Sequence, residues 1–128
     1  FMREVLLVAA CGALGATSRY GVGVFLQRLL GEGFVFGTLA VNLTGCLLLG
    51  FVYHTAQVRE IFGTQFSVAL GVGFLGALTT FSTFGLETFL CLEQRRYALA
   101  GMSVAINLVG GLLLVWTGIT LARSILGQ

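Results

Sequence analysis

The chain has 128 residues, of which 57% are hydrophobic and only 9% are charged. Ordinary soluble domains carry about 25% charged residues, so this composition argues against a soluble globular protein. The net charge of +2 comes from seven basic and five acidic side chains that mostly fall at the edges of apolar runs, which argues against a basic surface that binds nucleic acid.

The first apolar stretch predicts a transmembrane helix over approximately residues 5–30, because a bilayer core needs about 20 apolar residues in helical form. Arg19 interrupts this stretch. A charged side chain at the centre of an inserted helix costs on the order of 3 kcal/mol, so Arg19 needs a partner or access to water. Two interpretations stay open and are compatible: a structural Arg satisfied by backbone carbonyls or water, and an electropositive vestibule that attracts anions.

Three uncharged runs predict the remaining helices, over approximately residues 34–58, 64–92 and 97–125. Helix three is unusual because residues 71–84 bring together glycines, then hydroxyls, then aromatic rings, which is typical of a locally unwound helix. Non-helical backbone at membrane depth is tolerated only where protein or a water-filled cavity satisfies its polar groups. The fold expected is therefore an all-α membrane protein of four helices, in one domain from Met2, the expected natural start, to residue 128, with a site at a break in helix three.

The distribution of Arg residues gives no fixed orientation in the membrane. Three are expected at the end that holds both termini and three at the other end: Arg3, Arg59 and Arg123 against Arg28, Arg95 and Arg96. Orientation normally follows an excess of basic residues on one side. A chain without this excess can insert both ways, so we expect an antiparallel dual-topology homodimer, paired about a two-fold axis in the membrane plane.

Helices two and four each carry a carboxamide at membrane depth. Thr38 lies one turn from Asn42, and Ser103 lies one turn from Asn107, so each helix presents a short polar stripe. Bonding between helices is the usual role of such groups. The two stripes together favour a polar path through the membrane.

Helix three places Phe81 and Phe84 on one face, beside the hydroxyls of Thr80 and Thr83. Such rings usually pack in a core. Aromatic rings also have electropositive edges, so two rings turned edge-on can solvate a small anion without adding a formal charge. Glu87 follows one turn later and is interpreted as a solvated vestibule carboxylate, with its role left open.

The motifs in helices one to three form a recognisable set: Gly12-Ala13-Leu14-Gly15-Ala16 with Arg19-Tyr20, Gly37-Thr38-Leu39 with Val41-Asn42 and Gly45, and Gly73-Phe74-Leu75-Gly76 through Phe84. On these motifs the chain resembles the Fluc (CrcB) family of fluoride channels. The resemblance implies a multi-pass protein of the bacterial inner membrane, in contact with lipid. It implies a homodimer with two antiparallel pores for passive fluoride export, which protects the cell, and a structural sodium ion at the dimer centre.

The resemblance also implies roles for pore residues. Phe81 and Phe84 match the paired pore phenylalanines, and Asn42 matches the pore asparagine. Thr80 and Ser82 match nearby hydroxyl positions. We therefore expect these five residues to line the fluoride pore, together with the polar groups of helices two and four.

Two main-chain positions, Gly76 and Thr79, match the helix break whose carbonyls hold the sodium ion in the family. Carbonyl oxygens suit hard cations. The chain departs from the family pattern at four positions: Ala77, where a second glycine is common, Asn107 and Gly111, where relatives can carry serines, and Ser103, where a relative can carry a tyrosine.

Two other classes of function remain as alternatives. A proton-coupled exporter of the small multidrug resistance type also has four short helices, but it needs a carboxylate within helix one, where Glu4 sits only at the start. A non-transporting scaffold subunit needs packing surfaces but no donors at membrane depth. We expect no enzyme, because the lone His54 has no evident nucleophile or metal-ligand set around it.

Overall fold

The computed structural model describes residues 1–31, 35–59 and 63–126. The described chain is helical, in four spans that are long and apolar enough to cross a membrane. The elements are α1 (Met2–Leu30) and α2 (Phe36–Arg59), then α3 (Thr64–Val68), η1 (Ala69–Leu75), α4 (Gly76–Leu78) and α5 (Phe81–Glu93) in the third span, and α6 (Tyr97–Ala105), η2 (Ile106–Gly110) and α7 (Gly111–Leu126) in the fourth.

The helix boundaries lie close to the predicted ones. The first helix begins at Met2 rather than at residue 5, and it continues without a break past Arg19. The predicted start of the second helix, residue 34, lies outside the described residues, and α2 is observed from Phe36. The two segments η1 and η2 have π-helical hydrogen bonding, which the sequence did not indicate.

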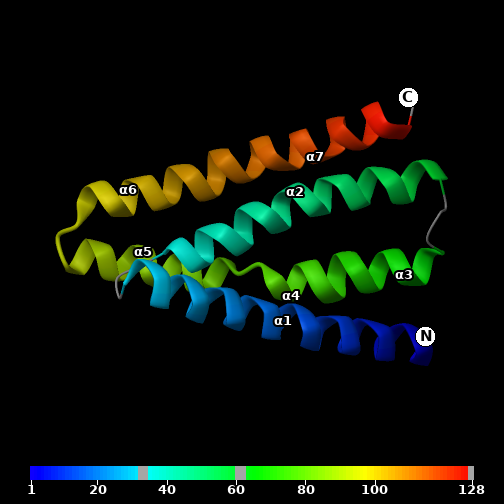
Figure 1. Ribbon diagram of the computed structural model, residues 1–128, viewed down its shortest axis with the longest axis horizontal. Helices are drawn as coiled ribbons and strands as arrows, with labels where there is room; N and C mark the ends of the chain where they lie inside the picture. Colours follow the sequence, from blue (N-terminus) through cyan, green and yellow to red (C-terminus); the bar gives the residue numbers. More distant parts are fainter. Residues whose placement is uncertain (32–34, 60–62, 127–128) are drawn as a thin grey trace.

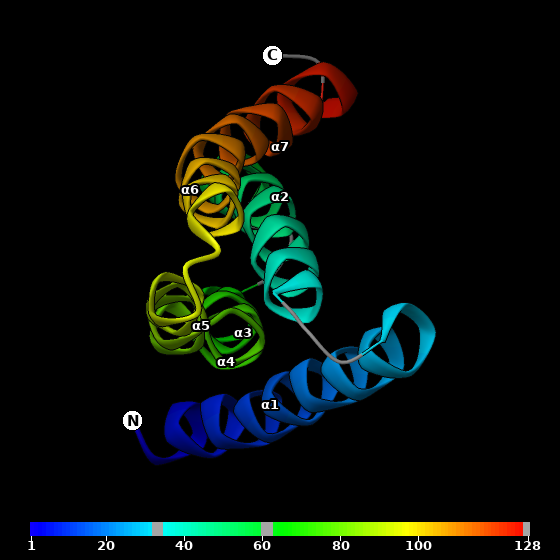
Figure 2. The ribbon, with the colours of Figure 1, turned by 90° about the vertical axis from the view of Figure 1, so that its left-hand side faces the viewer.

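The four spans lie side by side along the long axis of the molecule, with both termini at the same end (Figure 1). Seen from the end, α7 packs on α2, while α1 lies against η1 and α4 of the third span (Figure 2). Helices in lipid associate through close packing of small residues. Gly118 of α7 and Gly50 of α2 show this contact, because a Cβ on either glycine would collide with a backbone carbonyl of the other helix.

The third span leaves the helical conformation at Thr79 and Thr80. Thr79 has φ −81° and ψ 158°, and Thr80 has φ −152° and ψ 117°, both in the extended region. The Thr80 hydroxyl then caps α5 by accepting from the backbone N–H of Thr83 at 3.2 Å. The predicted break in helix three is confirmed, although Gly76, expected at the break, is still helical.

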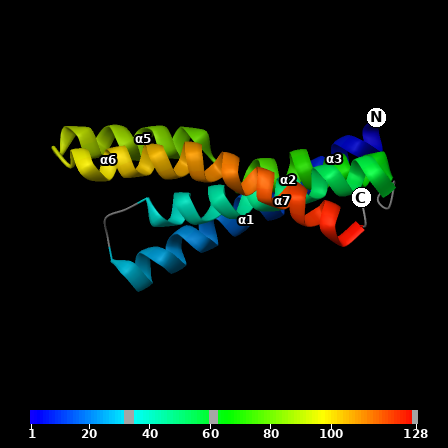
Figure 3. The same ribbon diagram turned by 90° about the horizontal axis from the view of Figure 1, so that it is seen from above.

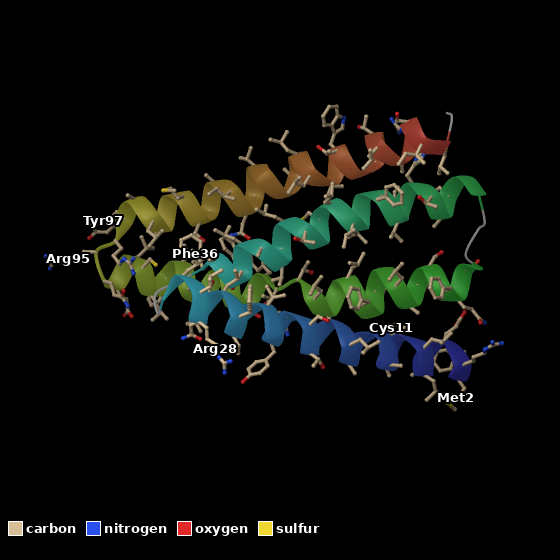
Figure 4. The ribbon with its side chains drawn as sticks, viewed as in Figure 1. Met2, Cys11, Arg28, Phe36, Arg95 and Tyr97 are labelled. Atoms are coloured by element: carbon tan, nitrogen blue, oxygen red, sulfur yellow. The ribbon has the colours of Figure 1, made fainter. Side chains whose placement is uncertain are left out.

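Beyond the break, the α5–α6 hairpin diverges from α1 and α2 (Figure 3). This divergence lies at the end of the molecule opposite the two termini. Arg28 and Arg95 lie at this same end, far from Met2 (Figure 4). Arg3 follows Met2 in α1 and Arg123 lies in the last turn of α7, so basic residues occur at both ends of the bundle.

Candidate functional site

The helix break is held by the side chain of Asn42 in the middle of α2. Its Oδ1 accepts the backbone N–H of Thr80 at 2.8 Å, and its Nδ2 donates to the backbone carbonyl of Thr80 at 3.1 Å. A carboxamide has the same donor and acceptor pair as a peptide group. Asn42 Oδ1 thus replaces the helical acceptor that the Thr80 N–H has lost at the break, so this N–H is paired at membrane depth.

A second carboxamide extends this network to the fourth span. Asn42 Nδ2 also donates to Asn107 Oδ1 at 2.9 Å, and Asn107 Nδ2 donates to the backbone carbonyl of Ser103 at 2.9 Å. The Ser103 hydroxyl, which is buried, lies 3.3 Å from the hydroxyl of Thr88 on α5. Polar contacts therefore join α2, the break, η2 and α5.

The two phenylalanines after the break form an edge-to-face pair. Their ring centroids are 5.4 Å apart, with an angle of 63° between the ring planes. Phe84 is buried, at 7% exposed, whereas Phe81 is 77% exposed in the single chain. The pair thus turns one ring into the bundle and leaves the other open at its surface.

Both rings line a cavity of about 230 Å³, together with the two carboxamides and the break. All the side chains around it are uncharged, and they belong to these residues: Asn42, Gly45, Cys46, Leu49, Leu75, Gly76, Thr79, Thr80, Phe81, Phe84, Asn107 and Leu108. Amide N–H groups and aromatic edges both direct partial positive charge outward. Such a lining offers contacts to an anion without a fixed opposite charge that would trap it.

A larger cavity of about 490 Å³, which we call the vestibule, lies between α1, α2 and α5. Its lining includes Arg19, Thr38, Thr80 and Glu87. Thr38 donates its hydroxyl hydrogen to Glu87 Oε1 at 2.9 Å, and Arg19 Nη1 donates to the backbone carbonyl of Thr79 at 3.1 Å. Arg19 thus has the backbone partner that its structural interpretation requires, and it also faces the vestibule.

The residues predicted for the pore are divided between these two spaces. Asn42, Asn107 and both phenylalanines line the uncharged cavity, and Thr38 lines the vestibule. Thr80 lines both, so the break lies where they meet. Ser82 contacts Thr80, with 3.3 Å between the hydroxyl oxygens, but is in the lining of neither space.

Three features of the site were not predicted. Glu87 was predicted to lie in the vestibule, but its hydrogen bond with Thr38 was not predicted. Thr38 is 49 residues away in the chain and was assigned to the polar stripe of helix two. Cys46, which was assigned no role in the pore, lines the cavity. Gly45 is needed for close approach, because a Cβ there would collide with the methyl group of Thr79.

Comparison with known proteins adds a family assignment to this geometry. Residues 6–119 match the family model described as CrcB-like protein, Camphor Resistance (CrcB). A relative from Shewanella amazonensis, named fluoride-specific ion channel FluC, is 45% identical over 123 residues, which cover 96% of this chain and 98% of the relative. Proteins of the same name from Dehalococcoides mccartyi and Shewanella woodyi are 44% and 41% identical, over 91% and 96% of this chain and 90% and 98% of their own lengths.

Proposed function

The chain belongs to the CrcB family, and on that premise we propose that it is a fluoride-selective channel, through which fluoride leaves the bacterial cell passively and the cell is protected from fluoride toxicity. It is a multi-pass bacterial membrane protein of a family of ion channels rather than of enzymes. The observation that carries the function is the uncharged cavity in which carboxamides and aromatic rings converge on a break in a transmembrane helix.

The geometry suggests how a small anion passes. The vestibule lining holds two basic side chains, Arg19 and Arg96, and one acidic side chain, Glu87, and this excess of positive charge raises the local concentration of anions. Thr80 and Thr83 both line the vestibule; Thr80 donates its hydroxyl hydrogen to Thr83 at 3.0 Å, which leaves the Thr83 hydroxyl hydrogen to replace a water molecule as a donor. The cavity that shares Thr80 with the vestibule is lined by the two carboxamides and by Phe81 and Phe84, whose ring edges carry partial positive charge. Each contact is weak enough to be exchanged for the next, which conduction requires.

The function is tested by reconstituting the purified protein in liposomes and following fluoride with a selective electrode, while an ionophore carries the counter-ion. We expect rapid fluoride loss and retention of chloride. Fluoride that stays inside vesicles containing folded protein would refute the proposal. It would also favour the scaffold alternative, which requires no flux.

The proton-coupled exporter has less support from the structure. In α1, which is described throughout, the one acidic residue is Glu4, in the first turn. A carboxylate at that position lies at the end of the span rather than at membrane depth. Glu87 lies within the third span, but Thr38 donates to it and it belongs to the vestibule wall.

We propose further that the working unit is an antiparallel dual-topology homodimer. Basic residues occur at both ends of the bundle, Arg3 and Arg123 at one and Arg28 and Arg95 at the other, which removes the usual bias of orientation. The exposed ring of Phe81 and the surface opening of its cavity are consistent with a second copy covering them. A cysteine introduced at Gln94 should react with an impermeant maleimide from both sides of the membrane, each side labelling about half of the chains. Labelling from one side alone would contradict dual topology.

We also propose a structural sodium ion, held by the backbone carbonyls of Gly76 and Thr79 from two copies. The chemistry fits, because the N–H of Thr80 is donated to Asn42 and leaves the Gly76 carbonyl without its helical donor. The Thr79 carbonyl accepts from Arg19 but has a second lone pair. The unfolding temperature should therefore be higher in sodium chloride than in potassium chloride of equal ionic strength, and equal values in the two salts would contradict a sodium site.

A further inference from the structure

We propose that fluoride crosses the half of the membrane nearer the two termini through a passage between α2 and the third span, and that Leu49 and Gly71 form its narrowest part. This rests on the proposed fluoride-channel function and extends its path. Among the described residues, no residue of α2 beyond Leu49 and no residue of α3 lines the vestibule or the uncharged cavity. A pore must therefore continue from the cavity to the end of the bundle that holds the termini.

A third cavity, of about 650 Å³, lies at that end, where the second half of α2 runs beside α3 and η1 (Figure 1). We call it the outlet, and its lining comes from within residues 49–57 and 63–72. The outlet shares Leu49 with the uncharged cavity, as the vestibule shares Thr80 with it. Along α2, Thr38 lines the vestibule, Asn42 the cavity and Tyr53 the outlet. The three spaces thus follow one another along the bundle.

The chemistry of the outlet suits a small anion that moves on with water. Every described residue in its lining is uncharged, so no carboxylate repels the anion and no basic side chain holds it there. Hydroxyl groups come from Tyr53, Thr64 and Ser67, and such groups can donate to an anion or to its water molecules. Its side toward the cavity is apolar at Leu49. The anion would therefore regain hydrogen-bond donors once it has passed Leu49.

The contact between Leu49 and Gly71 identifies the narrow point. A Cβ on Gly71 would lie 3.7 Å from Cδ1 of Leu49, so the leucine side chain reaches from α2 across to η1. Gly71 lies in the π-helical segment Ala69–Leu75, and such wide turns occur frequently at functional sites. Apolar constrictions can control conduction because they exclude water. One added methyl group at Gly71 would occupy the space that the glycine leaves beside Leu49.

The substitution Gly71→Ala adds that methyl group. Its contact with Leu49 would be an ordinary van der Waals contact, and alanine favours a helix over glycine, so we expect no fall in the unfolding temperature. An ion could then pass only if Leu49 moved, and we expect fluoride efflux from liposomes to fall roughly tenfold. The double variant Gly71→Ala with Leu49→Ala restores the space and should recover most of the lost flux. A purely structural role of Gly71 predicts no such recovery.

A second variant narrows the passage from the side of α2. Leu49→Phe should also lower fluoride efflux roughly tenfold. Leu48→Phe is its matched control, because Leu48 is 40% exposed against 43% for Leu49 and lies outside the lining of all three spaces. Gly21→Ala is the control for Gly71→Ala, since no described heavy atom lies within 4 Å of the added methyl group. Both controls should conduct like the unsubstituted protein.

These variants distinguish failure of the passage from failure of the channel. Undiminished flux in both Gly71→Ala and Leu49→Phe would overturn the inference. A double variant that conducts no better than Gly71→Ala would also overturn it, as would equal losses in Leu48→Phe and Leu49→Phe. Absence of fluoride flux from the unsubstituted protein would instead refute the proposed function.

Discussion

Replacing Asn42 by Ala is expected to abolish fluoride flux and to lower the free energy of unfolding by about 1–3 kcal/mol. The substitution leaves the N–H of Thr80, which has lost its helical acceptor at the break, without a partner, and an unpaired buried group of this kind has that cost. It also removes the donor to Asn107, whose carboxamide is then free to turn. The measurements are thermal unfolding in detergent and fluoride efflux from liposomes.

A matched control for Asn42 lies on the same helix. Gln57 of α2 is exposed and lies outside the cavity of the two carboxamides, so Gln57→Ala removes a carboxamide without exposing buried backbone. We expect the control to change stability by no more than about 0.5 kcal/mol, which is usual for surface substitutions. If Asn42→Ala unfolded at the temperature of the control, the side chain would not be what holds the break.

Replacing Phe81 by Ile should reduce fluoride flux by up to roughly tenfold while leaving the protein folded. Isoleucine keeps the apolar bulk but has no electropositive ring edge, and aromatic edge contacts are worth about 0.5–1.5 kcal/mol, whose upper limit corresponds to roughly a factor of ten. The ring of Phe81 is 77% exposed in the chain, so folding of the single chain depends little on it. Flux and unfolding temperature are measured on the same preparation.

Phe89 provides the comparison for Phe81. It lies on the same helix, α5, is 57% exposed and is outside the lining of both the cavity and the vestibule. Phe89→Ile should therefore conduct like the unsubstituted protein. Equal flux in all three proteins would show that the Phe81 edge does not contact the permeating ion. Equal losses in the two variants would instead indicate a general effect of removing aromatic bulk from α5.

The four spans and the break could be predicted because their causes are local. Long uncharged runs are sufficient to specify membrane helices, and glycines followed by threonines indicated where helix three is interrupted. The location of the break was less well specified, because glycines were expected to unwind the chain; instead Gly71 and Gly73 lie in the π-helical η1 and Gly76 lies in α4. The departure from helix occurs at Thr79 and Thr80, where the side chain of Asn42 on α2 accepts the backbone N–H of Thr80 in place of a helical carbonyl.

The partners within the site could not be predicted, because they are set by packing between distant segments. Asn42 and Asn107 were identified as donors at membrane depth. Nothing in either helix indicates that the amide group of Asn42 would donate to the Thr80 carbonyl and to Asn107. Glu87 and Thr38 similarly meet across two helices. Arg19 was expected to need a carbonyl or water, and only the fold shows that the carbonyl belongs to Thr79.

The central claim, a passive and fluoride-selective pore, is tested most directly by the reversal potential of the current across a planar bilayer that contains the protein. Fluoride, chloride and protons are set at different gradients on the two sides, so that each has its own equilibrium potential. The account predicts a current that reverses at the fluoride equilibrium potential and does not shift when the chloride or pH gradient is changed. A reversal potential that follows chloride would contradict selectivity, and one that follows the pH gradient would contradict passive conduction.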